Sequence, residues 1–197
     1  MLNKLNRVKK GEKGFTLIEL LVVCAIIGIL LALAIPNLIK ARMSANEANA
    51  RKILQTMRDA EGEYFEQDLP NVGQRTYSNL IGAKGTALSL RDPLGKSIET
   101  DALIDSSFEG ADQTTGCKQP KEGYCIQFDT ASAEAPAANA AGFYDDFAWQ
   151  DSPSSVNKTG RRDFAVYGDG VLRCVISSQA TAAAGIFEAI RTTPGCE

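Results

Sequence analysis

The chain has 197 residues, of which 44% are hydrophobic and 23% are charged, a balance typical of a folded protein of about one domain. It contains no histidine, which excludes catalytic sites and metal sites built on imidazole. The first 14 residues carry a net charge of +4 and the whole chain −3, so residues 15–197 carry −7. An acidic body argues against a general nucleic-acid binder, and DNA binding is not expected.

An apolar segment follows the basic tip and runs from Phe15 to Ile35, with Glu19 as its one charged residue. As a helix its 21 residues span roughly 31 Å, close to the ~30 Å hydrocarbon core of a bilayer. The positive-inside rule then predicts a cytoplasmic tip. A cleavable secretory signal is the alternative, with residues 32–34 imitating an A-x-A site. However, the apolar run exceeds the roughly 7–15 residues of such signals and carries a carboxylate.

Glu19 is the informative residue of this segment. A charge inside a membrane costs a few kcal/mol even on lenient insertion scales, so it requires a partner and a purpose. The alternative interpretation is a glutamate that merely lies near the membrane interface, since the position is shallow.

The residues around this glutamate form the motif Lys13-Gly14-Phe15-Thr16-Leu17-Ile18-Glu19-Leu20. It resembles the class III signal of type IV prepilins and type II secretion pseudopilins, in which a basic residue and Gly precede Phe-Thr-Leu-Ile-Glu at the start of a transmembrane helix. The resemblance implies that a membrane-embedded prepilin peptidase cuts between Gly14 and Phe15, methylates the new amine and leaves a mature chain of residues 15–197. It also implies a protein that is not an enzyme and that needs no cofactor or metal.

The same resemblance assigns assembly roles to Thr16, Glu19 and Pro36. Cutting creates an amine on Phe15 about one helical turn from Glu19, and in the family this glutamate pairs with the N-terminus of a neighbouring subunit. Pairing in lipid would neutralise two costly charges and fix the axial register. Pro36 cannot donate a helical hydrogen bond, so we expect either a kink or, as in many assembled pili, an unwound stretch.

A second helical pattern extends the apolar segment to about residue 67. Its apolar positions are typical of a face that packs on a globular domain, and they are Ala50, Ile53, Leu54, Met57, Ala60 and Tyr64. Charged residues, including Glu47, Glu61 and Arg51, are expected mostly off that face. The helix over 15–67 would be about 80 Å long, a length that indicates a spine. Residues 69–73 are expected to end it.

The rest of the chain is predicted to be a loop-rich connector with one or two short helices over 71–122, followed by strands. Residues 91–95 are predicted to form a turn and 131–142 an exposed loop. Strands are predicted at 124–128, at 143–149, at 164–167 and at 171–176, the last two joined by a hairpin at Gly168-Asp169-Gly170. The antiparallel sheet of three or four strands needs a cover, which the second half of the helix supplies. Residues 121–128 and 160–173 also resemble strand motifs of certain major-pilin-like proteins.

Four of the five cysteines lie downstream of the apolar segment. An even set in an exported domain predicts two disulfides, and three pairings are possible. We favour Cys117–Cys125 and Cys174–Cys196. In many type IV pilins a disulfide near the C-terminus closes an exposed loop, and the second pair would play that part. Four reduced thiols are the alternative in a cytosolic chain.

Other polar groups carry weaker signals. Asp145-Asp146 and the pair Asp163 and Asp169 are interpreted as solvated strand edges. The basic residues Lys158, Arg161, Arg162 and Arg173 are interpreted as a solvated loop surface, and a contact with DNA is the alternative. Asn157-Lys158-Thr159 fits the three-residue pattern of a glycosylation sequon.

Together these observations predict an α+β protein with the type IV pilin fold. Residues 1–14 form a cleaved leader, 15–67 a long helix whose transmembrane part is 15–36, and 68–197 a globular head with a C-terminal sheet. The predicted function is a pilin that polymerises with identical subunits into an extracellular pilus, and the alternative is a pseudopilin of type II secretion. Before assembly the chain would span the bacterial inner membrane once, with its head in the periplasm and an assembly platform as partner. Afterwards it would lie in a cell-surface filament.

Overall fold

The computed structural model describes residues 14–68, 73–178 and 187–196. Residues 1–13 of the predicted leader, and most of the predicted helix stop at 69–73, lie outside the described residues. The chain divides into two compact units, residues 1–40 and residues 41–197, and each unit is described by itself.

The first unit is helical from Leu17 onward. Here begins α1 (Leu17–Glu66), a helix of 50 residues that ends one residue before the predicted position. The large apolar side chains of its first part are exposed, among them Leu17 at 80% and Leu33 at 67%. Within the described part of the chain, α1 is the one helix long and apolar enough to cross a membrane by length and composition. The predicted membrane segment is therefore present as one exposed apolar helix.

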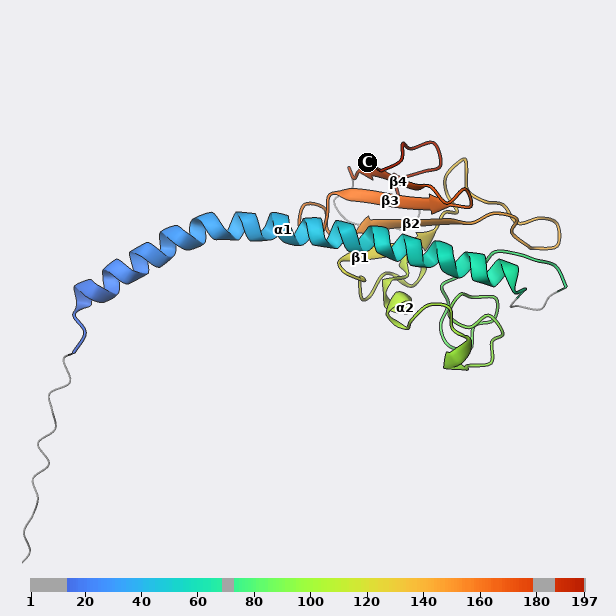
Figure 1. Cartoon of the computed structure of the whole chain (residues 1–197), viewed down its shortest axis with the longest axis horizontal. Coiled ribbons are helices and arrows are strands. Elements are labelled where there is room, and N and C mark those ends of the chain that lie inside the picture. Colours follow the sequence, from blue (N-terminus) through green and yellow to red (C-terminus); the bar gives the residue numbers. More distant parts are fainter. Residues whose placement is uncertain (1–13, 69–72, 179–186, 197) are drawn as a thin grey trace, which may run out of the picture. The chain divides into compact units, whose positions relative to one another are not determined.

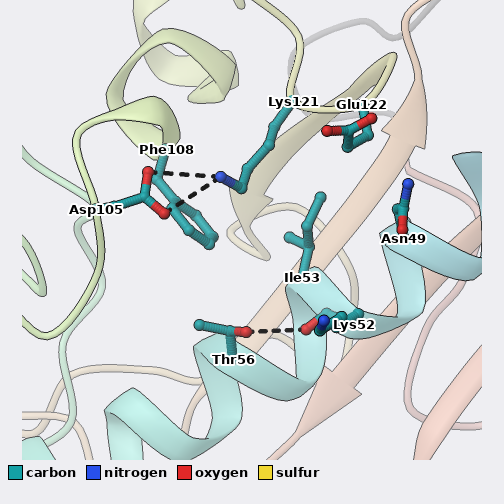
Figure 2. Close-up of a pocket in the computed structure, with 8 residues that line it drawn as sticks. All are labelled: Asn49, Lys52, Ile53, Thr56, Asp105, Phe108, Lys121 and Glu122. Carbon is teal, nitrogen blue, oxygen red and sulfur yellow. Dashed lines mark hydrogen bonds and ion pairs between the residues drawn. The ribbon is translucent and has the colours of Figure 1, made fainter.

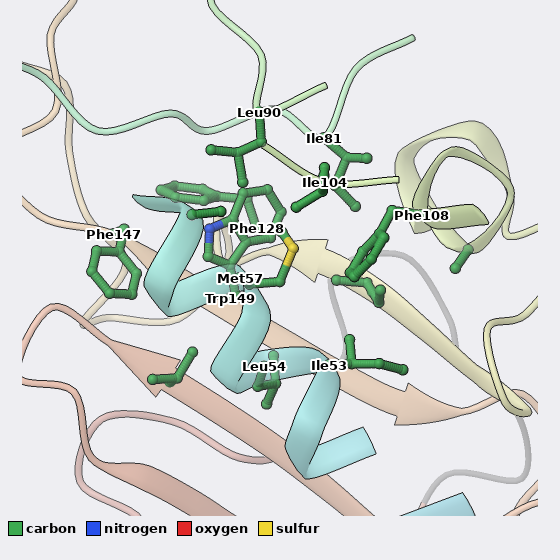
Figure 3. Packing of buried hydrophobic residues seen from close by; sticks show 14 of the residues in the cluster. Ile53, Leu54, Met57, Ile81, Leu90, Ile104, Phe108, Phe128, Phe147 and Trp149 are labelled. Atoms are coloured by element: carbon green, nitrogen blue, oxygen red, sulfur yellow. The ribbon is translucent and has the colours of Figure 1, made fainter. Parts of the chain in front are cut away.

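In the second unit, α1 buries one face against the head (Figure 1). The buried apolar residues of this face are Ala50, Ile53, Leu54, Met57, Ala60 and Tyr64, which confirms the face predicted from the helical spacing. Figure 3 shows several of them packed among Phe128, Phe147 and Trp149 of the head. One prediction is wrong: Glu61 is fully buried on this face and does not lie off it.

The head contains one antiparallel sheet of four strands in the order β1-β2-β3-β4. The strands are β1 (Tyr124–Phe128), β2 (Ala148–Pro153), β3 (Arg162–Tyr167) and β4 (Leu172–Ile176). This confirms the predicted sheet, but β2 begins later than predicted. Residues 139–142 form a turn, in which the Asn139 carboxamide accepts from the amides of Ala141 and Phe143, and Tyr144 forms isolated bridges with Tyr77 and Ala138 outside the sheet.

The sheet is covered on both faces, whereas the sequence predicted one cover. Trp149 and Phe164 face the core that contains α1. On the other face lie Gln150 and Tyr167, which are buried beneath residues 187–196. Gln150 Nε2 donates to the carbonyl of Ala189 at 2.9 Å. The second cover explains why the polar residues Gln150 and Ser152 of β2 are buried.

The connector between α1 and β1 contains the short α2 (Ser107–Ala111) and two 3₁₀ turns, η1 (Glu99–Asp101) and η2 (Gln113–Thr115). The predicted turn at 91–95 is present, since the amide of Gly95 donates to the carbonyl of Asp92. The Asp92 carboxylate also accepts from the amides of Gly85, Lys96 and Ser97, so it organises this loop. Those backbone hydrogen bonds outweigh its burial and hold the pKa of Asp92 below its ordinary value.

Candidate functional site

The start of α1 is a reciprocal cap between Thr16 and Glu19. The Thr16 amide donates to Glu19 Oε2 at 2.9 Å, and the Glu19 amide donates to Thr16 Oγ1 at 3.3 Å. The Thr16 hydroxyl also donates to Glu19 Oε2 at 2.7 Å. Because helix starts leave backbone amides without partners, this capping box stabilises the first turn. Sequence analysis singled out both residues but missed the cap, which the spacing Thr-x-x-Glu signals.

The surroundings of this cap are apolar. Phe15, Ile18 and Leu20 beside it are exposed, and Glu19 is the one charged residue of the described stretch 15–39. Within the described chain, Glu19 Oε2 takes the bonds from Thr16, and no hydrogen bond reaches Oε1. The geometry thus leaves one carboxylate oxygen available to a donor from another molecule.

Further along the apolar segment, α1 continues through Pro36. A proline lacks the amide that would donate to the carbonyl four residues before it. One residue later, the Asn37 side chain donates to the carbonyl of Leu33 at 3.3 Å, which adds a polar contact to the turn beside the proline. The single chain is therefore helical here, and unwinding in an assembled filament stays a prediction.

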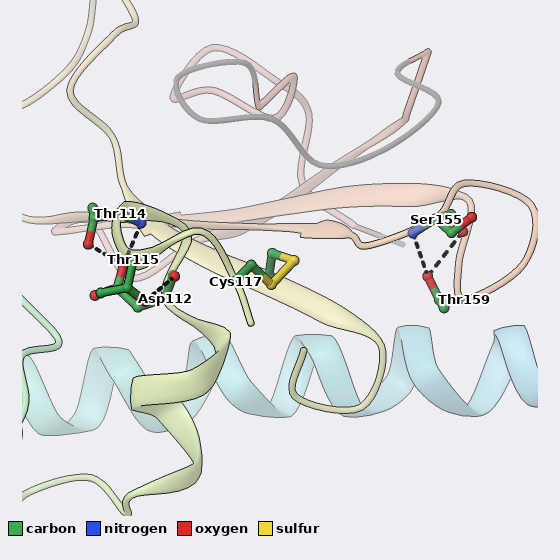
Figure 4. The surroundings of a disulfide bond; sticks show 7 residues. Asp112, Thr114, Thr115, Cys117, Ser155 and Thr159 are labelled. Carbon is green, nitrogen blue, oxygen red and sulfur yellow. Dashed lines mark hydrogen bonds between the residues drawn. A yellow bond between two sulfur atoms is a disulfide. The ribbon is translucent and has the colours of Figure 1, made fainter. Parts of the chain in front are cut away.

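The head contains both favoured disulfides, Cys117–Cys125 and Cys174–Cys196. Figure 4 shows the first beside the polar turn that follows α2. The second joins β4 to the C-terminal segment, where the amide of Cys196 also donates to the carbonyl of Leu172 at 3.0 Å. Cys24 is free and exposed in the apolar segment.

A buried carboxyl that sequence analysis placed outside the core joins α1 to the head. Glu61 accepts a hydrogen bond from the Trp149 indole at 2.7 Å and one from the Ser78 amide at 2.9 Å. Burial raises the pKa of Glu61 to about 8, although both hydrogen bonds oppose that shift. A sequence signal was present, since the spacing from Leu54 to Met57 to Glu61 keeps to one helix face.

Three of the aspartates that sequence analysis singled out make structural contacts in the head. Asp163 is buried, which makes its interpretation as a solvated edge wrong. It accepts from Ser152 Oγ at 2.7 Å and from the Glu188 amide at 3.1 Å, and thereby ties the C-terminal cover to the sheet. Asp146 is an ion-pair partner of Arg191, and Asp169 forms an ion pair with Arg173 at 2.5 Å.

No group of three or more His, Cys, Asp or Glu side chains in the described residues is placed to hold a metal ion. A cavity of about 220 Å³ lies between α1, α2 and the start of β1 (Figure 2). Its Lys121 side chain pairs with Asp105 at 3.3 Å and lies 4.4 Å from the centre of the Phe108 ring. These contacts explain the position of Lys121 as packing of the connector.

The site and the fold define a class of protein. Its members have an apolar N-terminal helix with a capped start, and this helix continues into a head built on an antiparallel sheet. The family model described as the prokaryotic N-terminal methylation motif matches residues 9–35, which include the capped start. No solved structure matches the chain significantly.

Three relatives show how far the similarity extends. The type IV major pilin protein PilA of Myxococcus xanthus is 41% identical over 64 residues, 32% of this chain and 29% of that protein. The type IV wide pilus major component PilA4 of Thermus thermophilus is 63% identical over 38 residues, 19% of this chain and 29% of that protein. A fimbrial protein of Dichelobacter nodosus is 36% identical over 121 residues, 56% of this chain and 66% of that protein.

The matched regions thus span between 29% and 66% of the length of these relatives. The methylation motif, the similarity to major pilins and the helix-on-sheet fold agree with one another. The chain belongs to the type IV pilin family.

Proposed function

We propose that the chain is the structural subunit of an extracellular type IV pilus, formed after prepilin peptidase removes residues 1–14. The observation that carries this proposal is the position of Glu19. It is a carboxylate in an exposed apolar helix, held by Thr16 with one oxygen left for a donor from another molecule.

The proposed mechanism follows from the cost of this charge in lipid. Cleavage between Gly14 and Phe15 creates a cationic amine on Phe15, and we expect the prepilin peptidase to methylate it. The amine of an incoming subunit then pairs with Glu19 of a subunit already in the filament. An ion pair removes two uncompensated charges from lipid together, which favours docking at one axial register.

The exposed apolar side chains of α1 favour the proposal that the chain forms a polymer. Identical helices with such surfaces associate with one another once they leave lipid. Repeated head-to-tail contacts between identical subunits extend as an open helix and do not close into a ring. Partners in this proposal are copies of the same chain, the prepilin peptidase and an assembly platform.

The proposed location of the chain changes when the filament assembles. The chain would first span the inner membrane with its head in the periplasm, where two disulfides form readily, and would then lie in a surface filament. The named relatives are pilus and fimbrial proteins, which favours this proposal over a periplasmic pseudopilus.

The proposal is tested by shearing filaments from cells that express the chain and from cells that lack its gene. We expect filaments that contain this chain as their main protein, and their loss in the deletion strain. Filaments of unchanged number and composition in the deletion strain would contradict the proposal.

A further inference from the structure

One end of the acidic head is basic. Residues 41–197 carry 15 lysines and arginines against 22 aspartates and glutamates. Four of the cations gather where α1 enters the head, and we name them the basic end: Arg42, Lys158, Arg161 and Arg162.

Two hydrogen bonds hold the basic end together. The turn between β2 and β3 is fixed to α1 because Asn46 Nδ2 donates to the carbonyl of Thr159 at 2.8 Å, and Glu47 accepts from the Arg161 amide at 2.9 Å. Figure 4 shows Ser155 and Thr159 of this turn beside α1. Arg42 precedes Asn46 by four residues and so lies on the same face of the helix, one turn nearer the apolar segment.

The cations of the basic end have no ion-pair partners in the described structure. Of the other eleven basic side chains of the head, six form ion pairs, namely Arg58, Lys84, Arg91, Lys121, Arg173 and Arg191. Arg42, Lys158 and Arg161 are exposed. Glu47 contacts the turn, and Glu122 and Glu188 lie on the segments beside it, so three acids face the four cations on a head whose net charge is −7.

The structure also separates this group from Arg173, which the sequence had placed with it. Arg173 pairs with Asp169 beyond the far end of β3, and its guanidinium lies 5.6 Å from the centre of the Tyr167 ring. A β3 of six residues is roughly 20 Å long, so Arg162 and Tyr167 mark opposite ends of the sheet. Because Arg173 lies elsewhere, the basic end is confined to the part of the head close to α1 and does not extend along the sheet.

We propose that the basic end binds the phosphate headgroups of anionic phospholipids while the chain is still in the membrane. The inference rests on the proposed membrane-anchored state. Arg42 follows Ile39, the last apolar residue of the segment, by three helical positions, or about 4.5 Å of rise. Glu47, which contacts the turn, lies eight positions after Ile39, or about 12 Å further along the axis of α1. The headgroup region on each side of a bilayer is about 5–8 Å thick, so long basic side chains at this height reach it.

Binding of this kind has a consequence for assembly. A lysine or arginine near an anionic surface contributes a fivefold change in binding, equivalent to about 1 kcal/mol. Extraction of a subunit from the membrane would break these contacts. The basic end therefore favours the membrane-anchored state over the filament, and it does so more strongly in membranes rich in anionic lipid.

The test uses the full chain in detergent and measures its binding of acyl-chain-labelled phosphatidylglycerol and phosphatidylcholine. We expect tighter binding of phosphatidylglycerol, weakened when ionic strength rises from about 0.1 M to about 1 M, which shortens the Debye length from about 10 Å to about 3 Å. The triple variant R42Q/K158Q/R161Q should bind phosphatidylglycerol about 100-fold more weakly, at about fivefold per residue. Binding of phosphatidylcholine should not change.

The matched control is Lys96→Gln. Lys96 is exposed in the connector, and Leu94 of the same loop lines a cavity with Glu63, near the other end of the α1 face. It should leave the lipid preference unchanged. The inference is overturned if the wild type and the triple variant prefer phosphatidylglycerol over phosphatidylcholine equally. It is also overturned if the triple variant keeps this lipid preference but loses binding of duplex DNA. Alkali-resistant membrane integration of each variant is measured in parallel, because a wild-type chain that fails to integrate contradicts the proposed function itself.

Discussion

The Glu61 carboxyl group on α1 accepts a 2.7 Å hydrogen bond from the indole of Trp149 on β2, a residue 88 positions later in the chain. Both side chains are buried, with exposed fractions of 0% and 1%. The Ser78 amide donates to the other oxygen, so one carboxyl joins the helix, the connector and the sheet. Loss of this group would leave two buried donors without an acceptor, which typically costs about 1–3 kcal/mol each.

The first prediction concerns the pH dependence of head stability. The pKa of Glu61 is raised from 4.5 to about 8, so the folded head binds a proton that the unfolded chain releases. Stability from this group is therefore fully present below pH 4.5 and is lost as pH rises toward 8. At about 1.36 kcal/mol per pKa unit the loss is about 5 kcal/mol at most.

Glu61→Gln should be less stable than wild type at pH 5 and should lose less stability between pH 5 and pH 8. Denaturant unfolding of the full chain at several pH values, followed by Trp149 fluorescence, measures both. Asp151 and Asp163 are also buried with raised pKa values, so the wild-type slope is shared and only the difference between wild type and variant reports on Glu61. Parallel curves for the two proteins would contradict the assignment.

The second prediction concerns processing. The mature chain should begin at Phe15 and carry an N-methyl group, because Gly14 and Phe15 occupy the cleavage position of the methylation motif. Intact-mass measurement and fragmentation of the native N-terminus check this. Gly14→Val should block the cut, since glycine permits a close approach to the backbone that a branched side chain prevents. A mature chain that begins at Ile35 would instead indicate ordinary signal cleavage.

The third prediction concerns the two disulfides. Replacement of Cys174 and Cys196 by alanine should destabilise the head by about 3 kcal/mol, since the bond closes a loop of 22 positions in the unfolded chain. The same replacement of Cys117 and Cys125, which are eight positions apart, should cost about 2.5 kcal/mol. Urea unfolding of the two double variants under non-reducing conditions compares them. Non-reducing peptide mapping of the native chain should show the same two pairs and free Cys24.

The sequence predicted those features that depend on local periodicity. The face of α1 from Ala50 to Tyr64 follows from helical spacing, and the β3–β4 hairpin follows from Gly168-Asp169-Gly170 between two apolar runs. Both signals lie within a few residues of the structure they specify. The Thr16–Glu19 cap was equally local, and its spacing was sufficient to predict it.

Features that depend on distant partners were not predictable from the sequence. Asp163 looks like an exposed edge residue until residues 187–196 fold over it, and its partners Ser152 and Glu188 lie on other segments. The start of β2 was misplaced for a related reason. Tyr144 pairs with Tyr77, a residue of the connector, so a run with aromatic residues typical of a strand forms an isolated bridge and bends instead of a ladder strand. Long-range contacts override local propensity at such positions.

The last prediction concerns Glu19 and its cap. Glu19→Gln keeps the shape of the side chain and lowers the cost of membrane insertion, but leaves the Phe15 amine of the adjoining subunit without a counter-charge. We expect normal cleavage after Gly14, normal accumulation in the membrane and a folded head, with few or no filaments. Glu19→Asp, shorter by one methylene, should give an intermediate number. Negative-stain microscopy of sheared cells counts the filaments, and immunoblots of membrane fractions report cleavage and accumulation.

Two variants of Thr16 separate the charge from the cap. Thr16→Ser retains the hydroxyl that donates to Glu19 Oε2 and should assemble as wild type does. Thr16→Val removes that hydroxyl, and loss of such a cap typically costs about 1 kcal/mol of helix stability. Because the carboxylate remains, Thr16→Val should assemble fewer filaments than wild type but more than Glu19→Gln. If Glu19→Gln forms as many filaments as wild type, the glutamate is not the assembly partner of the amine, and packing of the apolar residues 20–35 must fix the register between subunits.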